Sequence, residues 1–450
     1  MRLRASELAG ALGGRLHGPD VELHGVAIDS RAVHGGELFV PIVAERDGHD
    51  FVGAAVTGGA AAYLSARGPL DAAAPWIEVD DTARALLAVG REARRHLPDR
   101  VVGITGSVGK TTVKDLTAGA LGARFRTWAS ARSFNNELGV PLTVANAPAD
   151  TEALVVEMGA RGPGHIALLC EIAAPAIGVV TVVAAAHTEM FGSLDEVARA
   201  KSELVAALPA SGTAVLNAGD RRVLGMRRVT AAAVLTFAHD PAEGGSGAGS
   251  GADVTAAEVR VDDDLLASFR LHTPWGAVPV RLPVRGEHNV VNALAAAAAG
   301  LASGVPLEDV AAGLESATGS PSRMDLQRAP SGLVVVDDSY NSNPLSLEAG
   351  LRALARLPAG RRVAVLGVMA ELGADGPAEH RRLAGLAATL GIEVLAVGTD
   401  NYGVPWTVPD AGGAVAALAA LGPLGQGDAV LVKASRVADL GRVAEALLAG

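Results

Sequence analysis

The sequence predicts an α/β fold of three domains, and three observations support that prediction. The 450 residues exceed what one hydrophobic core usually supports, since domains commonly hold about 100–200 residues. Apolar residues make up 49% of the chain but aromatic residues only 3%, which favours helices packed on sheets over an all-β sandwich. From Thr82 onward, short apolar runs alternate with helical patterns, as expected for mostly parallel sheets covered by helices.

Residues 1–80 are predicted to form a small α+β domain. Short apolar runs alternate there with glycine turns, and no long helical pattern occurs before Phe51–Gly59. Residues 81–318 are predicted to form a central domain with a mostly parallel sheet. It begins with a helix at Thr82–His96, a strand at Val101–Ile104, a glycine loop and a helix at Thr111–Leu121. Further strands are predicted at Leu154–Val156, Ile177–Val183 and Ala214–Leu216.

Residues 319–450 are predicted to form a third, Rossmann-like domain, because the rhythm of strand and helix begins afresh after Arg323. Its expected strands are Leu333–Val336, Arg362–Leu366, Val394–Val397 and Ala429–Val432. Within the central domain, the glycine-rich and serine-rich segment Pro241–Asp253 is interpreted as a flexible surface loop between strands. Three domains of this size bury their own cores, so a monomer is predicted.

Charge and cysteine content exclude several classes of protein. The net charge is −11 with both signs spread along the chain, so no basic surface is expected to bind nucleic acid. The single cysteine, Cys170, permits no internal disulfide and is typical of a core residue in a reducing compartment. Neither a signal peptide, given Glu7, nor a membrane span at 174–186, given Pro175, is expected. A cytoplasmic location is therefore predicted.

The most specific local pattern is T-G-S-V-G-K-T-T at residues 105–112. It ends like a phosphate-binding loop, although Ile104 stands where the general pattern has glycine. Glycines let backbone N–H groups wrap a phosphate, and the following helix points its positive end at the same anion. An ordinary glycine turn is the alternative, but the flanking strand and helix favour ATP. The predicted ATP-binding residues here are Gly106, Ser107, Val108, Gly109, Lys110, Thr111 and Thr112.

The shortened loop resembles the TG-x-x-GKT loop of the Mur ligases, the ATP-dependent amide-forming enzymes of bacterial peptidoglycan synthesis. The resemblance continues through the chain in DSR (29–31), DGHDF (47–51), NNELGVP (135–141), EMGA (157–160), AHTEMFGS (186–193), AKSEL (200–204), GEHNVVNALAA (286–296), SRMD (322–325), DDSYNSNP (337–344), ELG (371–373) and VKASR (432–436). The resemblance implies a three-domain ligase that uses ATP and Mg²⁺. The DSYNSNP and EMGA segments further imply UDP-N-acetylmuramoyl-tripeptide and D-alanyl-D-alanine as the two substrates.

The chemistry implied is activation of a carboxylate by phosphorylation, followed by attack of an amine on the acyl phosphate. Lys110 would stabilise charge on the γ-phosphate. Glu157 ends the apolar run A-L-V-V-E and would complement Thr111 as a ligand of Mg²⁺, with a solvated strand-end acid as the alternative. His187 follows a strand, where a structural histidine is the alternative, and the resemblance implies contact with Mg²⁺.

Lys201 lies in the helical pattern 193–208 near Glu196 and Glu203, where a solvated lysine is the ordinary interpretation. The resemblance instead implies that this lysine is carbamylated, which makes it an anion able to help hold a second Mg²⁺. The predicted catalytic residues are therefore Lys110, Glu157, His187 and Lys201. The predicted metal ligands are Thr111, Glu157, His187 and carbamylated Lys201.

The rest of the ATP site is predicted to come from two domains. Asn289 and Asn292 open an alanine-rich helix, where they are suited to capping; the resemblance places Asn292, with His288 and Asn289, on the adenine side. Arg323 and Asp338 would reach the ribose and phosphates from the third domain, since an arginine fork suits phosphate oxygens. Such a split site requires the domains to close.

The two substrates are predicted to bind at opposite ends of the chain. In the N-terminal domain, Ser30 and Arg31 suit a diphosphate, while a simple β-turn is nearly as good an interpretation. The implied residues for the UDP-substrate are Ser30, Arg31, Asp47, His49, Asn135 and Asn136. In the third domain, polar residues follow the run L-V-V-V, where open α/β sheets bind ligands. Tyr340, Asn341 and Asn343 are predicted to contact the dipeptide.

Three positions depart from the family pattern: Gly219 replaces an acid on the adenine side, Ser133 replaces an asparagine, and Ala434 replaces a glycine. The nearest alternative function is the tripeptide-forming Mur ligase, whose diaminopimelate branch carries a D-N-P-R signature that this sequence lacks. Folylpolyglutamate synthase lacks a UDP-binding domain, and a P-loop kinase or motor needs no third domain. A nucleotide-binding partner module without turnover would not need the four predicted catalytic residues.

Overall fold

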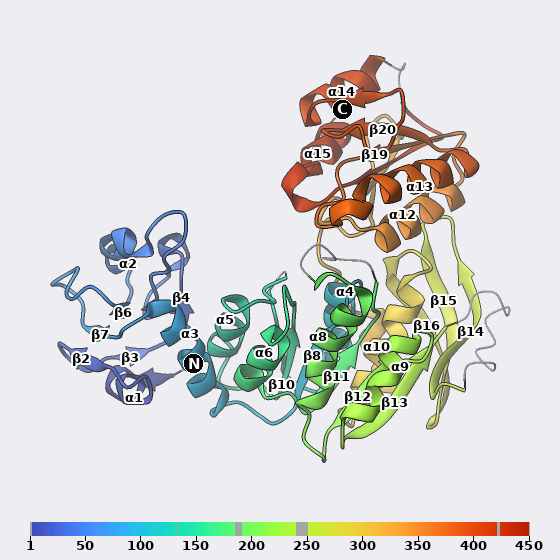
Figure 1. Cartoon of the computed structure of the whole chain (residues 1–450). Helices are drawn as coiled ribbons and strands as arrows, with labels where there is room; N and C mark the ends of the chain where they lie inside the picture. The colour runs from blue at the N-terminus through green and yellow to red at the C-terminus, as the bar shows by residue number, and fades with distance from the viewer. Residues whose placement is uncertain (1, 132, 185–190, 240–250, 421–423, 450) are drawn as a thin grey trace.

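The computed structural model describes residues 2–131, 133–184, 191–239, 251–420 and 424–449. It contains three main sheets that follow one another along the chain, each covered by helices (Figure 1). The predicted α/β fold with a small N-terminal sheet, a central mostly parallel sheet and a C-terminal Rossmann-like sheet is confirmed. The strands of each main sheet fall within one of the three predicted ranges, and the domain boundaries themselves stay predictions. No helix among the described residues is long and apolar enough to cross a membrane.

The N-terminal domain is built on a five-stranded sheet and a small two-stranded one. The larger sheet has the order β2-β7-β6-β5-β4, and the smaller one pairs β1 with β3. The bounds are β1 Leu3–Arg4, β2 Arg15–His17, β3 Glu22–Leu23, β4 Val26–Ala27, β5 Leu38–Phe39, β6 Ala62–Ser65 and β7 Trp76–Glu78. Helix α2 (Val52–Thr57) lies within the predicted helical pattern.

An additional short helix, α1 (Ala5–Ala11), was not expected from the sequence. Its buried residues Ala5, Leu8 and Ala9 follow the i, i+3, i+4 spacing of an amphipathic helix. Glu7 accepts a hydrogen bond from the backbone N–H of Arg4 (3.0 Å), which satisfies one of the free donors at the helix start. Only two turns of pattern were present, which is too short to distinguish from a loop.

The central sheet has nine strands in the order β16-β15-β14-β13-β12-β11-β8-β10-β9. In this order, the seven strands from β14 to β9, which include β8, are parallel. Strands β14, β15 and β16 form an antiparallel meander that the sequence did not reveal. The bounds are β8 Val101–Thr105, β9 Thr127–Ala129, β10 Ala153–Glu157, β11 Ile177–Val180, β12 Thr213–Asn217, β13 Ala233–Ala238, β14 Val254–Val261, β15 Leu266–Thr273 and β16 Gly276–Arg285. Most of Pro241–Asp253, interpreted as a flexible loop, lies outside the described residues.

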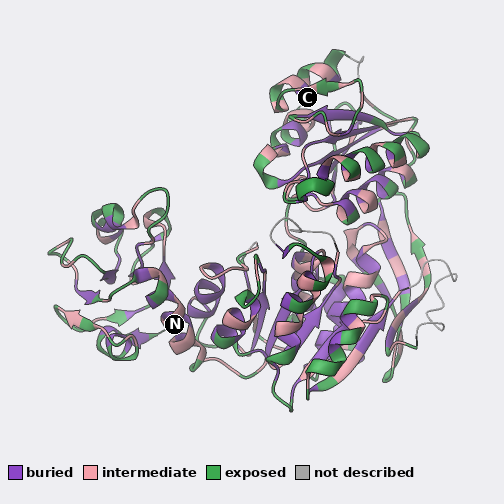
Figure 2. Cartoon of the chain, in the orientation of Figure 1, coloured by how far each residue is buried: buried purple, intermediate pink, exposed green. Residues whose placement is uncertain are grey.

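Alternate residues of the middle strands β8, β10 and β11 point into two apolar layers, so both faces of the sheet are buried there (Figure 2). Val102 and Ile104 of β8 pack in a cluster with α4 (Lys110–Gly122), α10 (Asn289–Ala302) and α11 (Leu307–Glu315). Val101 packs in the opposite cluster, whose helices are α3 (Thr82–Arg94), α5 (Gly139–Ala145), α6 (His165–Ala173) and α8 (Leu194–Ala206). Cys170 is buried in that second cluster, as predicted.

The C-terminal sheet has the order β17-β18-β22-β19-β20-β21, with only β17 antiparallel to its neighbour. Helices lie on both faces, as a Rossmann-like sheet requires. The strands are β17 Asp325–Arg328, β18 Val334–Asp337, β19 Arg361–Leu366, β20 Glu393–Val397, β21 Thr407–Val408 and β22 Asp428–Lys433. The helices are α12 Pro344–Arg356, α13 Gly376–Thr389, α14 Ala411–Ala420 and α15 Gly441–Ala449.

Candidate active site

A cavity of about 580 Å³ lies between the central and C-terminal domains. The central domain contributes the segments that follow β8, β10 and β11, together with the start of α10. The C-terminal side contributes Arg323, which lies in the linker between α11 and β17 (residues 316–324), and the segment that follows β18. Open α/β sheets bind ligands at the carboxyl ends of their strands, so this is where a ligand is expected.

The glycines of the predicted phosphate loop are required by their surroundings. Gly106 and Gly109 have φ of 146° and 84°, a region that favours glycine. A Cβ on Gly106 would lie 1.9 Å from Oγ1 of Thr181, and one on Gly109 would lie 2.5 Å from Oδ1 of Asn292. Thr181 also donates a hydrogen bond to the carbonyl of Val108 (2.6 Å). The end of β11 therefore supports the loop, a role for Thr181 that the sequence did not predict.

Lys110 folds back over the same loop. Its Nζ donates to the carbonyl oxygens of Gly106 (2.9 Å) and Ser107 (3.4 Å). Desolvation lowers the pKa of Lys110, while the nearby carboxylate of Glu157 opposes that shift. The ammonium group is thus held within the loop, where a phosphate ligand would meet it.

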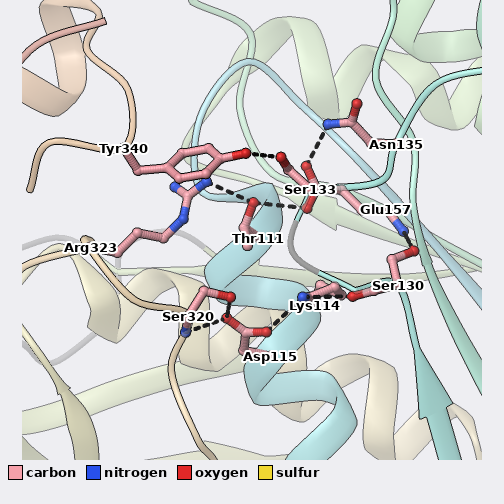
Figure 3. A network of polar contacts seen from close by, with 10 residues as sticks. All are labelled: Thr111, Lys114, Asp115, Ser130, Ser133, Asn135, Glu157, Ser320, Arg323 and Tyr340. Carbon is pink, nitrogen blue, oxygen red and sulfur yellow. Dashed lines mark hydrogen bonds and ion pairs between the residues drawn. The ribbon is translucent and has the colours of Figure 1, made fainter. Parts of the chain in front are cut away.

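Glu157 and Thr111 form the centre of a buried polar network (Figure 3). The Thr111 hydroxyl donates to Oε2 of Glu157 (2.8 Å), and Nδ2 of Asn135 donates to Oε1 of the same carboxylate (2.8 Å). The backbone N–H of Glu157 donates to Oγ of Ser130 (3.2 Å). Because Glu157 is only 1% exposed, the interpretation as a solvated strand-end acid is wrong. The role of Ser130 was not predicted, and no motif in the sequence around it indicated a contact with Glu157.

The donor set beside the loop fits a magnesium ion that also binds a nucleotide. Mg²⁺ prefers oxygen ligands and usually takes one or two from protein and the rest from phosphates and water. Thr111 and Glu157 supply a hydroxyl and a carboxylate in direct contact. Within the described ranges, no group of three or more His, Cys, Asp or Glu side chains is placed to hold a metal ion. His187, the other predicted ligand, lies outside the described residues.

Lys201 lies on α8 and lines the cavity, so the interpretation as a solvated lysine is wrong. Burial, together with the positive charge of Lys110, lowers the pKa of Lys201 to about 7. A substantial fraction of this amine is therefore neutral at neutral pH. The neighbouring Glu203 contacts other groups instead: it accepts hydrogen bonds from the backbone N–H of Gly164 (2.6 Å) and of Ala167 (3.0 Å).

Residues of the C-terminal domain contact the central domain directly at the cavity. A terminal nitrogen of the Arg323 guanidinium donates to the Thr111 hydroxyl (2.9 Å), and its carbon atom lies 4.3 Å from the centre of the Tyr340 ring. The hydroxyl of Tyr340 contacts the hydroxyl of Ser133 (Figure 3). The departure from the family pattern at Ser133 thus lies at a contact between domains.

The predicted adenine-side residues lie at the start of α10. Asn292 donates to Oδ1 of Asn289 (2.7 Å), and Asn289 donates to the carbonyl of Arg285 (2.6 Å). All three of His288, Asn289 and Asn292 line the cavity. Burial lowers the pKa of His288, against the opposing effect of Asp338. Asn289 thus stabilises the entry to the helix, which leaves Asn292 facing the loop at Gly109.

Asn217 also lines the cavity, two residues before Gly219, and its role was not predicted. Nδ2 of Asn217 donates to the carbonyl of Thr181 (2.8 Å), and its Oδ1 accepts from the backbone N–H of Gly219 (2.9 Å).

Asp338 takes part in a buried ion pair that the sequence did not predict. Nζ of Lys433 lies 2.6 Å from Oδ2 of Asp338 and donates to the carbonyl of Asn341 (2.9 Å). A signal for Lys433 was present, because the chain has only four lysines: Lys110, Lys114, Lys201 and Lys433. Lys114, Lys201 and Lys433 are at most 3% exposed. The fourth lysine, Lys110, belongs to the phosphate loop. All four lysines therefore lie in or next to the candidate active site. Elsewhere in the chain, the basic side chains are arginine and histidine.

The predicted dipeptide residues Tyr340, Asn341 and Asn343 all line the cavity. Asn343 also caps α12, since its Oδ1 accepts from the backbone N–H of Ser346 (3.0 Å). The segment after β18 is therefore fixed at both ends, by the helix cap and by Lys433.

The predicted UDP-substrate residues fall into two groups. Asn135 and Asn136 line the cavity, whereas Ser30, Arg31, Asp47 and His49 lie in turns of the N-terminal domain and do not. Arg31 pairs with Asp29 (2.6 Å), and the hydrogen bonds from Arg31 lower the pKa of Asp29 to about 2.

Asp47 is bound on two sides. It contacts Nδ1 of His49 (2.7 Å) and also the guanidinium of Arg67. The buried Nε2 of His49 has no hydrogen-bond partner within the part of the chain that the structure describes.

Most of the chain is similar in sequence to known Mur ligases. Residues 104–300 match the family model of the Mur ligase middle domain, and residues 322–436 match that of the Mur ligase glutamate ligase domain. UDP-N-acetylmuramoyl-tripeptide–D-alanyl-D-alanine ligase of Mycobacterium tuberculosis (strain H37Rv) is 40% identical, across 94% of this chain and 92% of that protein.

Two solved structures extend the similarity to three dimensions. A crystal structure of MurF from Acinetobacter baumannii has a TM-score of 0.87 and 32% identity, covering 100% of this chain and 99% of that one. MurF ligase from Thermotoga maritima, solved in complex with ADP, has a TM-score of 0.80 and 27% identity, covering 94% and 97%. The chain therefore belongs to the Mur ligase family.

Proposed function

We propose that this protein is the ATP-dependent ligase that joins D-alanyl-D-alanine to UDP-N-acetylmuramoyl-tripeptide. The choice of substrates is supported by the 40% identity to a relative that carries this activity in its name, over 94% of the chain. The geometry supports ATP-dependent ligation through one observation above the others. Thr111 of the phosphate loop contacts Glu157 of the central sheet and Arg323 of the C-terminal domain at once.

The proposed reaction has two steps. A carboxylate oxygen of the tripeptide attacks the γ-phosphorus of ATP, forming an acyl phosphate as the bond to ADP breaks. The amine of D-alanyl-D-alanine then attacks the acyl carbon, and phosphate leaves as the amine loses a proton. Lys110 and the backbone N–H groups of the loop stabilise the charge that develops on the transferred phosphate. Arg323 adds a second cation from the opposite domain.

We assign Thr111 and Glu157 to Mg²⁺, which when bound supplies positive charge that neutralises the nucleotide phosphates. Asn135 and Ser130 hold Glu157 before any ligand arrives, because they hydrogen-bond its carboxylate and its backbone N–H. Such supporting contacts orient a ligand residue for its metal. His187 and carbamylated Lys201 are proposed as further ligands on the family resemblance, and the burial of Lys201 beside Lys110 supports the modification.

The remaining assignments follow the position of each residue in the cavity. His288, Asn289, Asn292 and Asp338 are assigned to the adenosine of ATP, and Tyr340, Asn341 and Asn343 to the dipeptide. Asn135 and Asn136 are assigned to the peptide end of the UDP-substrate, and Ser30, Arg31, Asp47 and His49 to its UDP end. A monomer and a cytoplasmic location stay predictions.

Product analysis tests this function directly. Phosphate release from Mg-ATP is measured with UDP-N-acetylmuramoyl-tripeptide and either D-alanyl-D-alanine or single amino acids, and the product mass is determined. We expect release and a pentapeptide product only with the dipeptide, and release slowed about 10³-fold in a Lys110→Met variant. Turnover of a dipeptide precursor with a single amino acid would identify the tripeptide-forming alternative. ATP binding without ligation of any acceptor would indicate a nucleotide-binding module.

A further inference from the structure

The linker between the central and C-terminal domains is held on helix α4 by a residue outside the assigned site. Oδ2 of Asp115 accepts hydrogen bonds from both the backbone N–H (2.9 Å) and the hydroxyl (2.7 Å) of Ser320. Asp115 is itself paired with Lys114 (2.8 Å), and their side chains are 11% and 4% exposed (Figure 3). A partly buried carboxylate therefore receives both polar groups of one linker residue.

The spacing along α4 links this contact to the phosphate loop. Thr111 and Asp115 are four residues apart, so they lie on the same face of the helix, about 6 Å apart along its axis. The linker contacts both: Ser320 at Asp115 and, three residues later, Arg323 at Thr111. Three residues of chain can span about 10 Å. The linker therefore runs along this face of α4 toward the phosphate loop.

The other side of the linker is bound to the C-terminal domain. The carbonyl of Ser322 accepts from the backbone N–H of Tyr340 (3.2 Å), and the backbone N–H of Met324 donates to Oδ1 of Asp338 (3.2 Å). Ser322 and Met324, on either side of Arg323, have φ of 56° and 54°. Residues other than glycine seldom adopt this conformation unless their surroundings fix it. Only Pro321 therefore lies between Ser320, which is bound to α4, and Ser322, which is bound to the C-terminal domain.

Lys114 connects the same anchor to the metal-binding side of the site. Its Nζ donates to the carbonyl of Ser130 (2.9 Å), and the hydroxyl of Ser130 accepts from the backbone N–H of Glu157. The Lys114–Asp115 pair therefore ties the linker and the end of β10 to one helix. Neither residue lines the cavity.

We propose that Asp115 is a positioning residue for ligation: by holding Ser320 on α4, it fixes the start of the linker so that Arg323 is delivered to Thr111. The proposal rests on the proposed function, because the reaction is what the position of Arg323 serves. It assigns the pivot of the C-terminal domain to the backbone at Pro321, between the attachments at Ser320 and Ser322. Displacement of a charged group by about 1 Å is enough to lower a rate by about 10²-fold.

Two variants remove the anchor to different extents. Asp115→Ala removes both hydrogen bonds to Ser320, and Ser320→Ala removes only the one from the hydroxyl and spares the Lys114–Asp115 pair. Asp264→Ala is the matched control, because Asp264 pairs with Arg328 of the C-terminal domain (2.7 Å) away from the linker. We expect kcat to fall about 10–100-fold in Asp115→Ala and less in Ser320→Ala, with KM for the UDP-substrate unchanged and no change in the control.

A double-mutant cycle separates positioning from general stability. If Asp115 acts through Arg323, Asp115→Ala lowers kcat much less in an Arg323→Ala background than in the unaltered protein. An equal loss in both backgrounds would overturn the proposal, as would unchanged kcat in both anchor variants. Ser320→Ala supplies the same cycle should Asp115→Ala not fold.

Hydrogen exchange supplies a readout that needs no ligation. Amides of residues 316–324 are expected to exchange faster in Asp115→Ala and Ser320→Ala than in Asp264→Ala, because their local opening costs less free energy. Unchanged exchange would overturn the proposal. Absence of ligation by the unaltered protein would count against the proposed function, and exchange would then decide whether Asp115 holds the linker.

Discussion

The N-terminal and C-terminal domains are joined to the central domain by interfaces of opposite character. Apolar residues of the N-terminal domain, including Leu8 and Leu38, belong to one continuous cluster with Val140 and Leu154 of the central domain. The C-terminal domain has apolar clusters of its own, to which the central domain adds mainly Leu265 and Val261 at the tip of the β14–β15 hairpin. Its polar contacts with the central domain include those of Tyr340 with Ser133, Ser320 with Asp115 and Arg323 with Thr111 (Figure 3).

This difference indicates which interface a ligand can remodel. Separating an apolar interface costs about 25 cal/mol of free energy for each Å² of apolar surface exposed to water. Binding of a charged substrate does not offset this cost. A polar contact such as Arg323 to Thr111 can be replaced by contacts to phosphate with little loss, since both are charge-assisted. We therefore expect the N-terminal and central domains to behave as one body, and the C-terminal domain to move on its linker as substrates bind.

The largest effect is expected where the polar interface meets the phosphate loop. Lys110→Met keeps the apolar stem but removes the charge that we propose stabilises the γ-phosphate, and kcat is expected to fall about 10³-fold. The free energy of unfolding is expected to stay the same or rise, because burial already disfavours this ammonium. Steady-state ligation and urea denaturation measure the two quantities. A variant that lost activity only by unfolding would contradict the assignment.

The next largest effect concerns Lys201. If its amine carries a carbamate, Lys201→Ala is expected to lose about 10²-fold or more in kcat, with partial recovery on adding short carboxylic acids that replace the missing anion. Native mass spectrometry with and without ¹³C-bicarbonate tests the modification in the unaltered protein. With only four lysines in the chain, the modified site is simple to locate. No dependence on bicarbonate together with no rescue would remove Lys201 from the metal ligands.

A pair of core substitutions tests whether two domains unfold together. Leu8 and Leu351 are both fully buried, in the cluster shared with the central domain and in the C-terminal domain respectively. Each Leu→Ala change is expected to cost about 3 kcal/mol. Leu8→Ala should shift the unfolding transition of the central domain as well, whereas Leu351→Ala should shift only that of the C-terminal domain. Domain-resolved proteolysis during denaturation distinguishes the two. A separate N-terminal transition would contradict the single body.

A smaller effect is expected at Asn146, which makes polar contacts within the apolar interface. Its side chain accepts from the backbone N–H of Val26 (2.8 Å) and donates to the carbonyl of the same residue (2.9 Å). Asn146→Ala leaves both backbone groups unsatisfied, which is expected to cost about 1–3 kcal/mol. Urea denaturation measures this loss, and kcat should not change. A fall in kcat at constant stability would mean that this interface also positions the site.

The sequence predicted local structure better than contacts between domains. The strands at Val101–Ile104 and Ala429–Val432 and the glycine loop between Thr105 and Lys110 were recognisable, because each is specified by neighbouring residues. The pairing of Ser133 with Tyr340, and of Asp115 with Ser320, joins segments more than 200 residues apart. No periodicity encodes such contacts, since they depend on how separately folded units dock.

The buried lysines show a second limit of local reasoning. The charged neighbours of Lys201 favoured a solvated lysine, whereas the family resemblance assigned it to the site, and α8 points it into the cavity. Lys114 and Lys433 were not assigned at all. Composition contained the missing signal, because lysine is scarce while arginine is common. Burying a lysine requires specific partners, and here Ser130, Asp115 and Asp338 supply them.

The smallest effect is expected at the exposed edge of the C-terminal interface. Arg328 of β17 pairs with Asp264 in the β14–β15 turn, and the two side chains are 59% and 52% exposed. Solvent screens a pair of this kind, so Arg328→Ala is expected to change the free energy of unfolding by less than about 1 kcal/mol. Ligation rates should be unchanged at low and high salt. If this substitution instead lowered kcat in a manner that depends on salt, the surface pair would set the orientation of the C-terminal domain. The polar interface would then be controlled from its rim as well as from Asp115 and Arg323.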